Sequence, residues 1–492
     1  MSNQHYDVLI VGAGVSGIGM ACHLKQACPT KRFAILERRQ SLGGTWDLFR
    51  YPGIRSDSDM FTFGYKFRPW TGAKVLADGA SIKQYLIDTA EEKEVEKHIR
   101  YGLAVKTADW SSAERCWTLK AINEQSGETE TFTANFMVGC TGYYNYDQGY
   151  KPDFPGEEEF KGDVVHPQHW PENLDYTGKK VVVIGSGATA ITLVPTMAEK
   201  AKHVTMLQRS PSYLMPLPST DKITLVMQKF LPEKLSYKLT RARNIFISRL
   251  LYQRSRKSPE AMRRFFLWIV ERQLKGKADM RHFTPDYNPW DQRLCVVKDG
   301  DLFEAIKAGT ASVKTDHIER FTETGIRLKS GEELEADIII PATGLNIQML
   351  GGIKPTVDGQ EVILKDKVVY KSVMVEGVPN AGMIFGYTNN PWTLKVDIAS
   401  EYLCRLLNYM DNHGHQVAVP RDTENSRGED TVMGSLDSGY IKRAEDTLPR
   451  QGTHGPWVAV QDYRKDIKVL CSDAIADGYL EFDGQHGLAA PA

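Results

Sequence analysis

The stretch Tyr6-Asp-Val-Leu-Ile-Val-Gly-Ala-Gly-Val-Ser-Gly17 decides the fold of this chain. Its first six residues are mostly apolar and β-branched, which predicts a buried strand. Gly12, Gly14 and Gly17 follow at the spacing Gly-x-Gly-x-x-Gly, and a helical pattern continues to about Lys25. Glycines at this spacing permit a tight turn and a close approach of backbone to a pyrophosphate, and the helix N-terminus favours the anion.

An acidic residue completes this first unit. The next predicted strand, Phe33–Leu36, ends at Glu37, about 20 positions past the glycines. A carboxylate at that place can bind ribose hydroxyls. A lone Gly-x-Gly-x-x-Gly is weak evidence, but strand, turn, helix and acid together predict a dinucleotide site.

A second unit follows the same plan with a different ending. Lys180–Ile184 is a buried strand that enters Gly185-Ser-Gly187-Ala-Thr-Ala190, and the strand after the next helix is followed by Gln208-Arg209-Ser210. An acid would repel a ribose 2′-phosphate, whereas Arg209 attracts one. We therefore interpret the first site as one for FAD and the second as one for NADPH.

The composition narrows the class of protein. The chain has 492 residues, of which 41% are hydrophobic and 25% are charged. Its formal net charge of −1 gives no general electrostatic attraction to nucleic acid. Its seven cysteines are scattered and form no Cys-x-x-Cys, which argues against a disulfide framework or a zinc site and favours a reducing compartment. We expect no metal site, no transmembrane segment and a cytoplasmic protein.

The expected fold class is α/β, with two Rossmann-like dinucleotide-binding domains and a helical insertion. We predict an FAD-binding domain over residues 1–145 and 335–492 (with a C-terminal tail), an NADPH-binding domain over 146–215 and 285–334, and an insertion over 216–284. Further elements expected are helices over 80–97, 394–410 and 462–471, a meander of strands over 102–109 and 116–122, and a strand over 383–387.

The insertion is strongly basic. Residues 231–281 contain 14 Lys and Arg but only 4 Asp and Glu. We interpret this basic face as solvated surface, and two alternatives stay open: attraction of the NADPH phosphates, or weak association with an anionic membrane surface.

Between the two glycine turns lies Phe160-x-Gly162-x-x-x-His166-x-x-x-Trp170-Pro171. This spacing resembles the fingerprint of Baeyer–Villiger flavin monooxygenases. Matching motifs also occur at residues 12–17, 43–57, 185–190, 289–293 and 342–344, so the resemblance covers nearly the whole chain. The chain resembles the class B flavin monooxygenases of Baeyer–Villiger type I, and in particular the bacterial subgroup typified by the ethionamide-activating monooxygenase.

The resemblance implies an activity. NADPH reduces FAD, O2 adds to the flavin to give a C4a-peroxyflavin, and the peroxide attacks a ketone to yield an ester or lactone. Oxidation of thioethers and thioamides is implied as a second activity. Arg293 matches the active-site arginine of the family, and Asp57 matches the acid beside it that would hold its orientation. We interpret His166 as part of a joint between the cofactor domains and not as a proton-transfer group.

The residues expected to contact the cofactors are Gly12, Gly14, Ser16, Gly17, Glu37, Gly44, Thr45, Trp46, Asp57, Val105, Gly185, Ser186, Gly187, Ala188, Thr189, Arg209, Ser210, Thr343 and Gly344. One position departs from the family pattern. Many members carry Lys immediately before the arginine, where this chain has Gln292. Preference for NADPH over NADH should therefore depend mainly on Arg209.

Two other functions compete with this prediction. The first is an N- or S-oxidising flavin monooxygenase that makes no esters. The second is a flavoprotein whose main role is to bind a partner or a lipid surface through the basic insertion. The sequence leaves the preferred substrate and the oligomeric state open.

Overall fold

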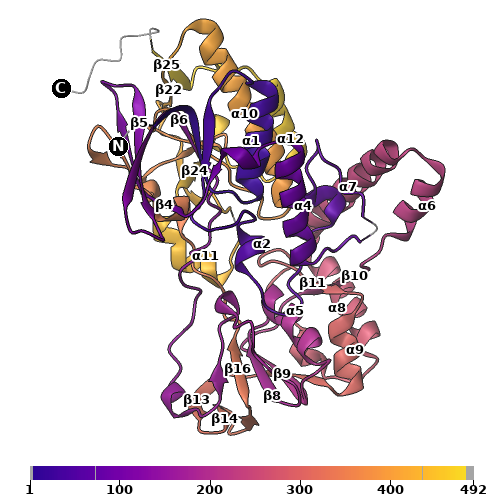
Figure 1. Cartoon of the computed structure of the whole chain (residues 1–492). Coiled ribbons are helices and arrows are strands. Elements are labelled where there is room, and N and C mark those ends of the chain that lie inside the picture. Colours follow the sequence, from indigo (N-terminus) through magenta and orange to yellow (C-terminus); the bar gives the residue numbers. More distant parts are fainter. Residues whose placement is uncertain (1–3, 73, 435, 484–492) are drawn as a thin grey trace.

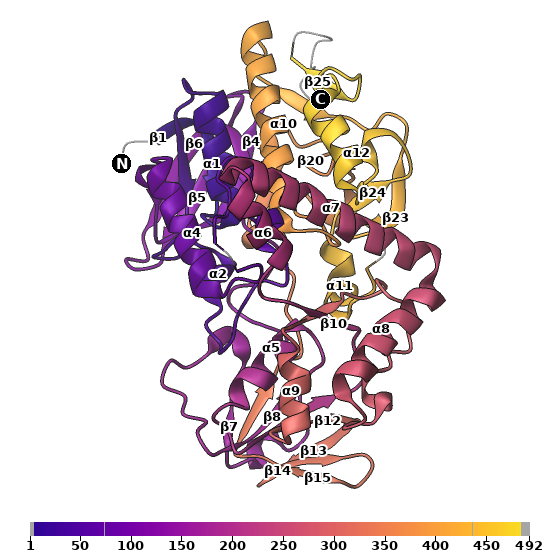
Figure 2. The same ribbon diagram turned by 90° about the vertical axis from the view of Figure 1, so that its right-hand side faces the viewer.

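The computed structural model describes residues 4–72, 74–434 and 436–483. The chain forms two lobes, one above the other in Figure 1, and each lobe is built on a sheet that contains a Rossmann-like βαβ unit. Figure 2 shows the long helix α7 (Glu233–Lys257) lying across the upper lobe, with α8 (Pro259–Leu274) descending from its end toward the lower lobe. The expected α/β fold with two dinucleotide-type units and a helical insertion is thus confirmed.

The upper lobe contains a nine-stranded sheet in the order β18-β17-β4-β5-β6-β1-β2-β3, with β21 paired to β6. The strands are β1 (Gln4–Val11), β2 (Phe33–Leu36), β3 (Ile99–Arg100), β4 (Leu103–Ser111), β5 (Cys116–Asn123), β6 (Thr129–Gly139), β17 (Lys354–Val357), β18 (Gln360–Glu361) and β21 (Ala381–Met383). β1 runs parallel to β2 and β6, and β4, β5 and β6 form the expected antiparallel meander. Val8 and Ile10 share one buried cluster with α1 (Val15–Ala27) and α10 (Trp392–His413), and Leu9 belongs to the cluster on the other face. A strand covered on both faces must be apolar throughout, which explains the run in β1.

The lower lobe contains a five-stranded sheet in the order β12-β9-β8-β16-β7. Its strands are β7 (Asp163–Val164), β8 (Lys180–Ile184), β9 (His203–Gln208), β12 (Ala311–Thr315) and β16 (Ile338–Pro341), with α5 (Ala188–Met197) and α9 (Asp301–Ala308) packed beside it. A separate three-stranded sheet comprises β13 (Ile318–Thr322), β14 (Gly325–Leu328) and β15 (Glu333–Glu335). The boundary predicted at residue 335 is too early, because β16 pairs with β7 and β8 in the lower sheet.

The insertion is helical as expected, with α6 (Lys222–Phe230), α7 and α8. Its predicted start at residue 216 falls inside a strand, because β10 (Leu214–Leu217) pairs in parallel with β11 (Cys295–Lys298). The helix predicted over 80–97 ends earlier: α4 (Gly79–Glu92) stops before Glu94, whose φ of 50° is incompatible with a helix.

Two other predicted elements differ at their ends. The strand predicted over 383–387 lies earlier, at β21, where Ala381, Gly382 and Met383 pair with β6. The helix expected over 462–471 is a short α12 (Tyr463–Ile467) that continues as one wider turn, Lys468–Ser472.

Two segments of the chain cross between the lobes, and they lie side by side around residues 145–150 and 344–346. Asn145 donates its backbone N–H to the carbonyl of Asn346 at 2.9 Å, and Tyr150 donates to the carbonyl of Gly344 at 3.1 Å. Residues 160–171 brace the first crossing: the Gln168 amide donates to the Asn145 carbonyl at 2.8 Å, and the His166 ring lies against Gly149, where an added Cβ would come within 2.1 Å of it. These contacts agree with the interpretation of His166 as part of a joint.

All seven cysteines are free thiols. Among the described residues, the longest and most apolar helices still fall short of what is needed to cross a bilayer.

Candidate functional site

A cavity of about 400 Å³ extends from the first glycine turn to the N-terminus of α5 in the other lobe. It is lined by twelve of the predicted site residues, namely Gly12, Gly14, Ser16, Glu37, Gly44, Thr45, Trp46, Asp57, Val105, Ala188, Thr189 and Arg293, with Val11 and Cys140 beside the turn. The other predicted residues do not line it: Gly17, Gly185, Ser186, Gly187, Arg209, Ser210, Thr343 and Gly344.

The first glycine turn leaves the floor of the cavity free of side chains. Gly12 has a φ of 102°, and a Cβ there would lie 2.6 Å from the carbonyl oxygen of Cys140. Gly14 caps α1 and faces Gly44, and a Cβ on Gly44 would lie 3.0 Å from the Gly14 Cα. Gly17 is buried beneath the turn, where a Cβ would collide with the Gly12 carbonyl. The result is a bare backbone cradle at a helix N-terminus, which suits a pyrophosphate.

Glu37 is held at the end of β2 by backbone donors. Its carboxylate accepts from the N–H of Ala13 at 2.6 Å and from the N–H of Arg39 at 2.8 Å, and only 5% of the residue is exposed. Burial raises the pKa of Glu37, while the two backbone donors oppose that rise. The acid thus lies directly against the glycine turn, where it can reach the ribose of a dinucleotide bound there.

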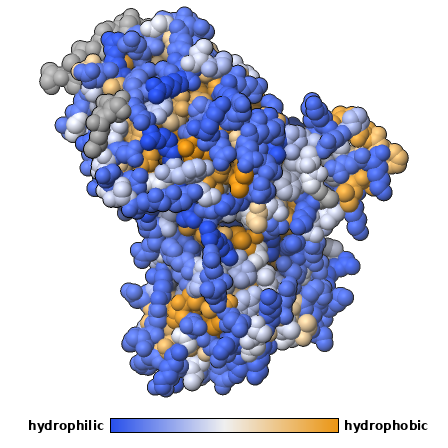
Figure 3. Space-filling view, viewed as in Figure 1, coloured by the Kyte–Doolittle hydropathy of each residue, from blue (hydrophilic) through white to orange (hydrophobic). Residues whose placement is uncertain are grey.

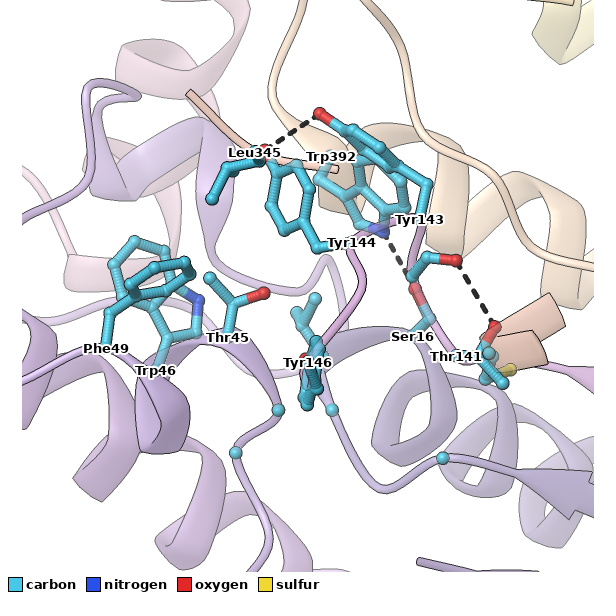
Figure 4. A pocket seen from close by; sticks show the side chains of 18 of the residues that line it. Ser16, Thr45, Trp46, Phe49, Thr141, Tyr143, Tyr144, Tyr146, Leu345 and Trp392 are labelled. Carbon is cyan, nitrogen blue, oxygen red and sulfur yellow. Dashed lines mark hydrogen bonds between the residues drawn. The ribbon is translucent and has the colours of Figure 1, made fainter. Parts of the chain in front are cut away.

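Aromatic side chains form one wall of the cavity, as Figure 4 shows. Tyr143 stacks on Trp392 with ring centroids 5.3 Å apart, and its hydroxyl lies 2.9 Å from that of Tyr144. The Trp392 indole N–H donates to the Ser16 hydroxyl at 2.8 Å, so α10 and the start of α1 meet here. This wall is apolar in its body with a few fixed polar atoms, which is typical of cofactor and substrate pockets.

Arg293 enters the same cavity from the loop before β11. It is exposed toward the cavity, although protein atoms surround it. Burial opposes its charge, but the oxygens of Tyr143, Tyr440 and Tyr144 and the carboxyl of Asp57 raise the pKa of Arg293 above its ordinary value. The guanidinium therefore stays charged at any working pH.

Asp57 is half-buried in the cavity wall, and the tertiary fold brings it into the electrostatic field of Arg293. Burial raises the pKa of Asp57 to about 6, against the opposing effects of Arg55 and Arg293. The direct contact expected between Asp57 and Arg293 is not formed: among the described side chains, no ion pair within 4 Å joins them. Arg55 instead pairs with Asp301 at 3.5 Å.

The raised pKa of Asp57 predicts a pH-dependent stability. An acid whose folded pKa exceeds its unfolded value stabilises the fold below pH of about 4, and this contribution is lost as pH rises through about 6. Asp57→Asn stays uncharged, so its free energy of unfolding should rise relative to that of the wild type between about pH 4 and about pH 7, by at most about 3 kcal/mol. Calorimetry at matched flavin content measures this. Asp153→Asn, at an exposed site, should follow the wild type, and parallel curves for Asp57→Asn would contradict the expectation.

The second glycine turn is open at the surface of the lower lobe. Gly185 has a φ of 142°, and a Cβ there would meet the Ala342 carbonyl at 2.4 Å, whereas Gly187 has open space beside it and caps α5. The Ser186 hydroxyl lies 3.0 Å from that of Ser212. Arg209 is exposed directly after β9, one residue before the half-buried Ser210. The helix N-terminus and the cation thus stand on the same open edge of the sheet.

Thr343 and Gly344 belong to the crossing between the lobes. The Thr343 hydroxyl donates to the Tyr150 carbonyl at 2.6 Å, and the Gly344 carbonyl accepts from the Tyr150 N–H. In this structure they join the two crossing segments.

Some cavity residues escaped the sequence analysis. Tyr143 and Tyr144, which line the cavity, follow directly after Cys140-Thr-Gly142. Tyr440, which is not a lining residue but raises the pKa of Arg293, comes from a segment almost 300 residues further on. Two adjacent aromatics directly after a Thr-Gly turn at the end of a buried strand were a usable signal, whereas nothing in the local sequence marks Tyr440.

Comparison with known proteins agrees with this geometry. Residues 75–375 match the family described as flavin-binding monooxygenase-like, and residues 10–72 match an NAD(P)-binding Rossmann-like domain. Over 484 residues the chain is 59% identical to the FAD-containing monooxygenase MymA of Mycobacterium tuberculosis, covering 98% of each. It is 51% identical over 481 residues to the FAD-containing monooxygenase EthA of the same organism, covering 97% of this chain and 98% of EthA.

Solved structures share the fold. A steroid monooxygenase bound to NADP superimposes with a TM-score of 0.77 at 22% identity, covering 97% of this chain and 99% of that one. The resemblance drawn from the motifs is confirmed at the level of the family. The chain belongs to the flavin-binding monooxygenase-like family.

Proposed function

We propose that this protein is an FAD- and NADPH-dependent monooxygenase that inserts one oxygen atom of O2 into ketones, giving esters or lactones, and that also oxidises thioethers and thioamides. The observation that carries the proposal is the single cavity that joins the first glycine turn, Asp57 and Arg293 to the N-terminus of α5 in the second unit. Relatives named as FAD-containing monooxygenases support it, as does the fold shared with an NADP-bound steroid monooxygenase.

The residues present fit FAD. The cradle formed by Gly14 and Gly44 has no side chain that would exclude a pyrophosphate. The N-terminus of α1 directs the positive end of the helix dipole into this cradle. Glu37 would bind ribose, and Thr45, Trp46 and Val105 would border the rest of the cofactor. When bound and reduced, FAD would supply the activation of O2.

The protein supplies the electrostatics. Arg293 places a permanent cation in the cavity that the aromatic wall borders. A preorganised cation there stabilises negative charge that develops on oxygen during attack on a carbonyl. Asp57, once ionised above about pH 6, adds a carboxylate to the field around that cation.

The residues also fit NADPH. The open N-terminus of α5 beside Gly187 would receive the pyrophosphate, and Arg209 would pair with the 2′-phosphate. Ala188 and Thr189 line the same cavity as the first glycine turn, so the two proposed cofactor sites would meet at the start of α5.

A product assay tests the proposal. The holoenzyme is incubated with NADPH, isotopically labelled O2 and either a linear aliphatic ketone or an aryl methyl sulfide. We expect an ester that carries one labelled oxygen, and a labelled sulfoxide. Sulfoxide without ester across a range of ketone chain lengths would favour the N- or S-oxidising alternative, and no oxygenated product with either class would contradict the proposal.

Coenzyme preference gives a second test. Arg209→Ala should raise the KM for NADPH about ten- to a hundred-fold, because a charge-assisted contact to phosphate is lost, and should leave the KM for NADH nearly unchanged. Steady-state rates with both coenzymes measure the ratio. Lys202→Ala removes an exposed cation from the same lobe and should change neither value. Equal effects of Arg209→Ala on both coenzymes would exclude Arg209 as the phosphate site.

A further inference from the structure

The helix α7 presents its apolar side to solvent. Leu235, Leu239, Phe246 and Leu250 recur at spacings of four, seven and four, which places them on one face of the helix. All four are among the exposed large hydrophobic residues, with 42–51% of their surface accessible. Soluble helices normally turn such a stripe toward the core.

The face of α7 that is turned toward the protein is polar, and it forms hydrogen bonds with the segment beneath it. Its buried residues are Ser236, Tyr237, Thr240, Arg241 and Ser255. Arg241 donates to the carbonyls of Phe61 at 2.9 Å and Gly64 at 2.7 Å. These hydrogen bonds fix the orientation of α7 about its own axis. The apolar stripe therefore faces solvent because the fold places it there.

The neighbouring helix α6 extends this surface. Ile223, Val226 and Phe230 are spaced at three and four residues, and Phe230 is 81% exposed. α6 and α7 project from the body in Figure 1, and Figure 3 shows apolar residues gathered at the tip of this projection. We call the stripe of α7 and the three residues of α6 the apolar tip.

Exposed lysines surround the apolar tip: Lys222, Lys229, Lys234 and Lys238. Within residues 4–72, 74–434 and 436–483, none of these four lysines forms an ion pair. Arg243, which lies in α7, does form one, with Asp221. Lysine is depleted in the cores of protein–protein interfaces but common on helices that lie in membrane interfaces, where its long stem keeps the charge in the headgroup region.

We propose that the α6–α7 projection seats on an anionic lipid surface, with the apolar tip inserted among the acyl chains and the four lysines against the headgroups. Charge complementarity selects this occupant, because a neutral apolar partner would leave four cations unpaired. This proposal is independent of the monooxygenase activity, since no cavity residue takes part.

Vesicle sedimentation tests the proposal. The holoenzyme is mixed at low salt with vesicles of phosphatidylcholine alone or with added phosphatidylglycerol. We expect binding to the anionic vesicles that weakens at high salt. The double variant Phe230→Ser/Phe246→Ser and the charge variant Lys234→Glu/Lys238→Glu should each lose about ten-fold or more in partitioning. The control pair Ile363→Ser and Lys365→Glu, exposed but outside the projection, should bind like the wild type.

Flavin content and sedimentation velocity are recorded for every variant, so that a folding defect is separated from lost binding. Failure of the folded wild type to bind anionic vesicles at low salt would overturn the proposal. So would unchanged binding by both double variants. A third outcome is that the wild type does not bind vesicles but self-associates, and that Phe230→Ser/Phe246→Ser abolishes this self-association. The apolar tip would then be assigned to contact with a second copy of the chain.

Discussion

Arg293→Ala should abolish ester formation while NADPH still reduces the flavin. The guanidinium is the cation that the cavity places beside Tyr143 and Tyr144, and its charge does not vary with pH. Removal of a preorganised charge from such a site costs a factor of about 10² to 10³ or more in turnover. Electron entry depends on the lower lobe and should survive. Anaerobic stopped-flow absorbance of the flavin follows reduction, and gas chromatography measures ester per NADPH consumed.

Two variants make this test selective. Arg293→Lys keeps a positive charge without the planar fork, so it should retain part of the ester yield. Arg38→Ala removes a cation that lines another part of the cavity and pairs with Glu124 and Asp147, and it should leave ester per NADPH unchanged at saturating FAD. Ester formation by Arg293→Ala near the wild-type rate would refute the role of Arg293.

Gly12→Ala should give a protein that retains almost no FAD. The residue has a φ of 102°, and the new Cβ would lie 2.6 Å from the Cys140 carbonyl, which is fixed backbone at the end of β6. Either the turn or the strand end must move, and both border the cradle. Strain of this kind amounts to about 1–3 kcal/mol for the dihedral alone, before the collision is added. We expect a dissociation constant for FAD at least about a hundred-fold higher, measured by flavin fluorescence after ultrafiltration.

Gly127→Ala separates strain from collision. Gly127 has a φ of 74°, but a Cβ there meets nothing within 4 Å. This variant should lose about 1 kcal/mol of stability and keep its FAD. If Gly12→Ala purifies with a full complement of flavin, the assignment of the first turn as the FAD cradle is wrong.

Much of this architecture could be predicted because the relevant signals are local. A buried strand, a glycine turn and a helix lie within a few residues of one another, so residues 6–37 and 180–209 specified two dinucleotide units. The charge difference between Glu37 and Arg209 distinguished the two sites for the same reason. Strand ends were predicted less well where pairing partners are distant, as for β16, whose neighbours β7 and β8 lie more than 150 residues earlier.

The sequence by itself determined the two units, the basic helical insertion and, through the motifs, the candidates Asp57 and Arg293. Only the tertiary structure decided that these two residues share a cavity without forming an ion pair, that Tyr143 and Tyr440 surround the arginine, and that α7 carries its apolar stripe outward. The periodicity of a helix shows that it has two faces, but not which face is buried. That choice depends on contacts between residues far apart in the chain, such as Arg241 with the carbonyls of Phe61 and Gly64, which local sequence does not encode.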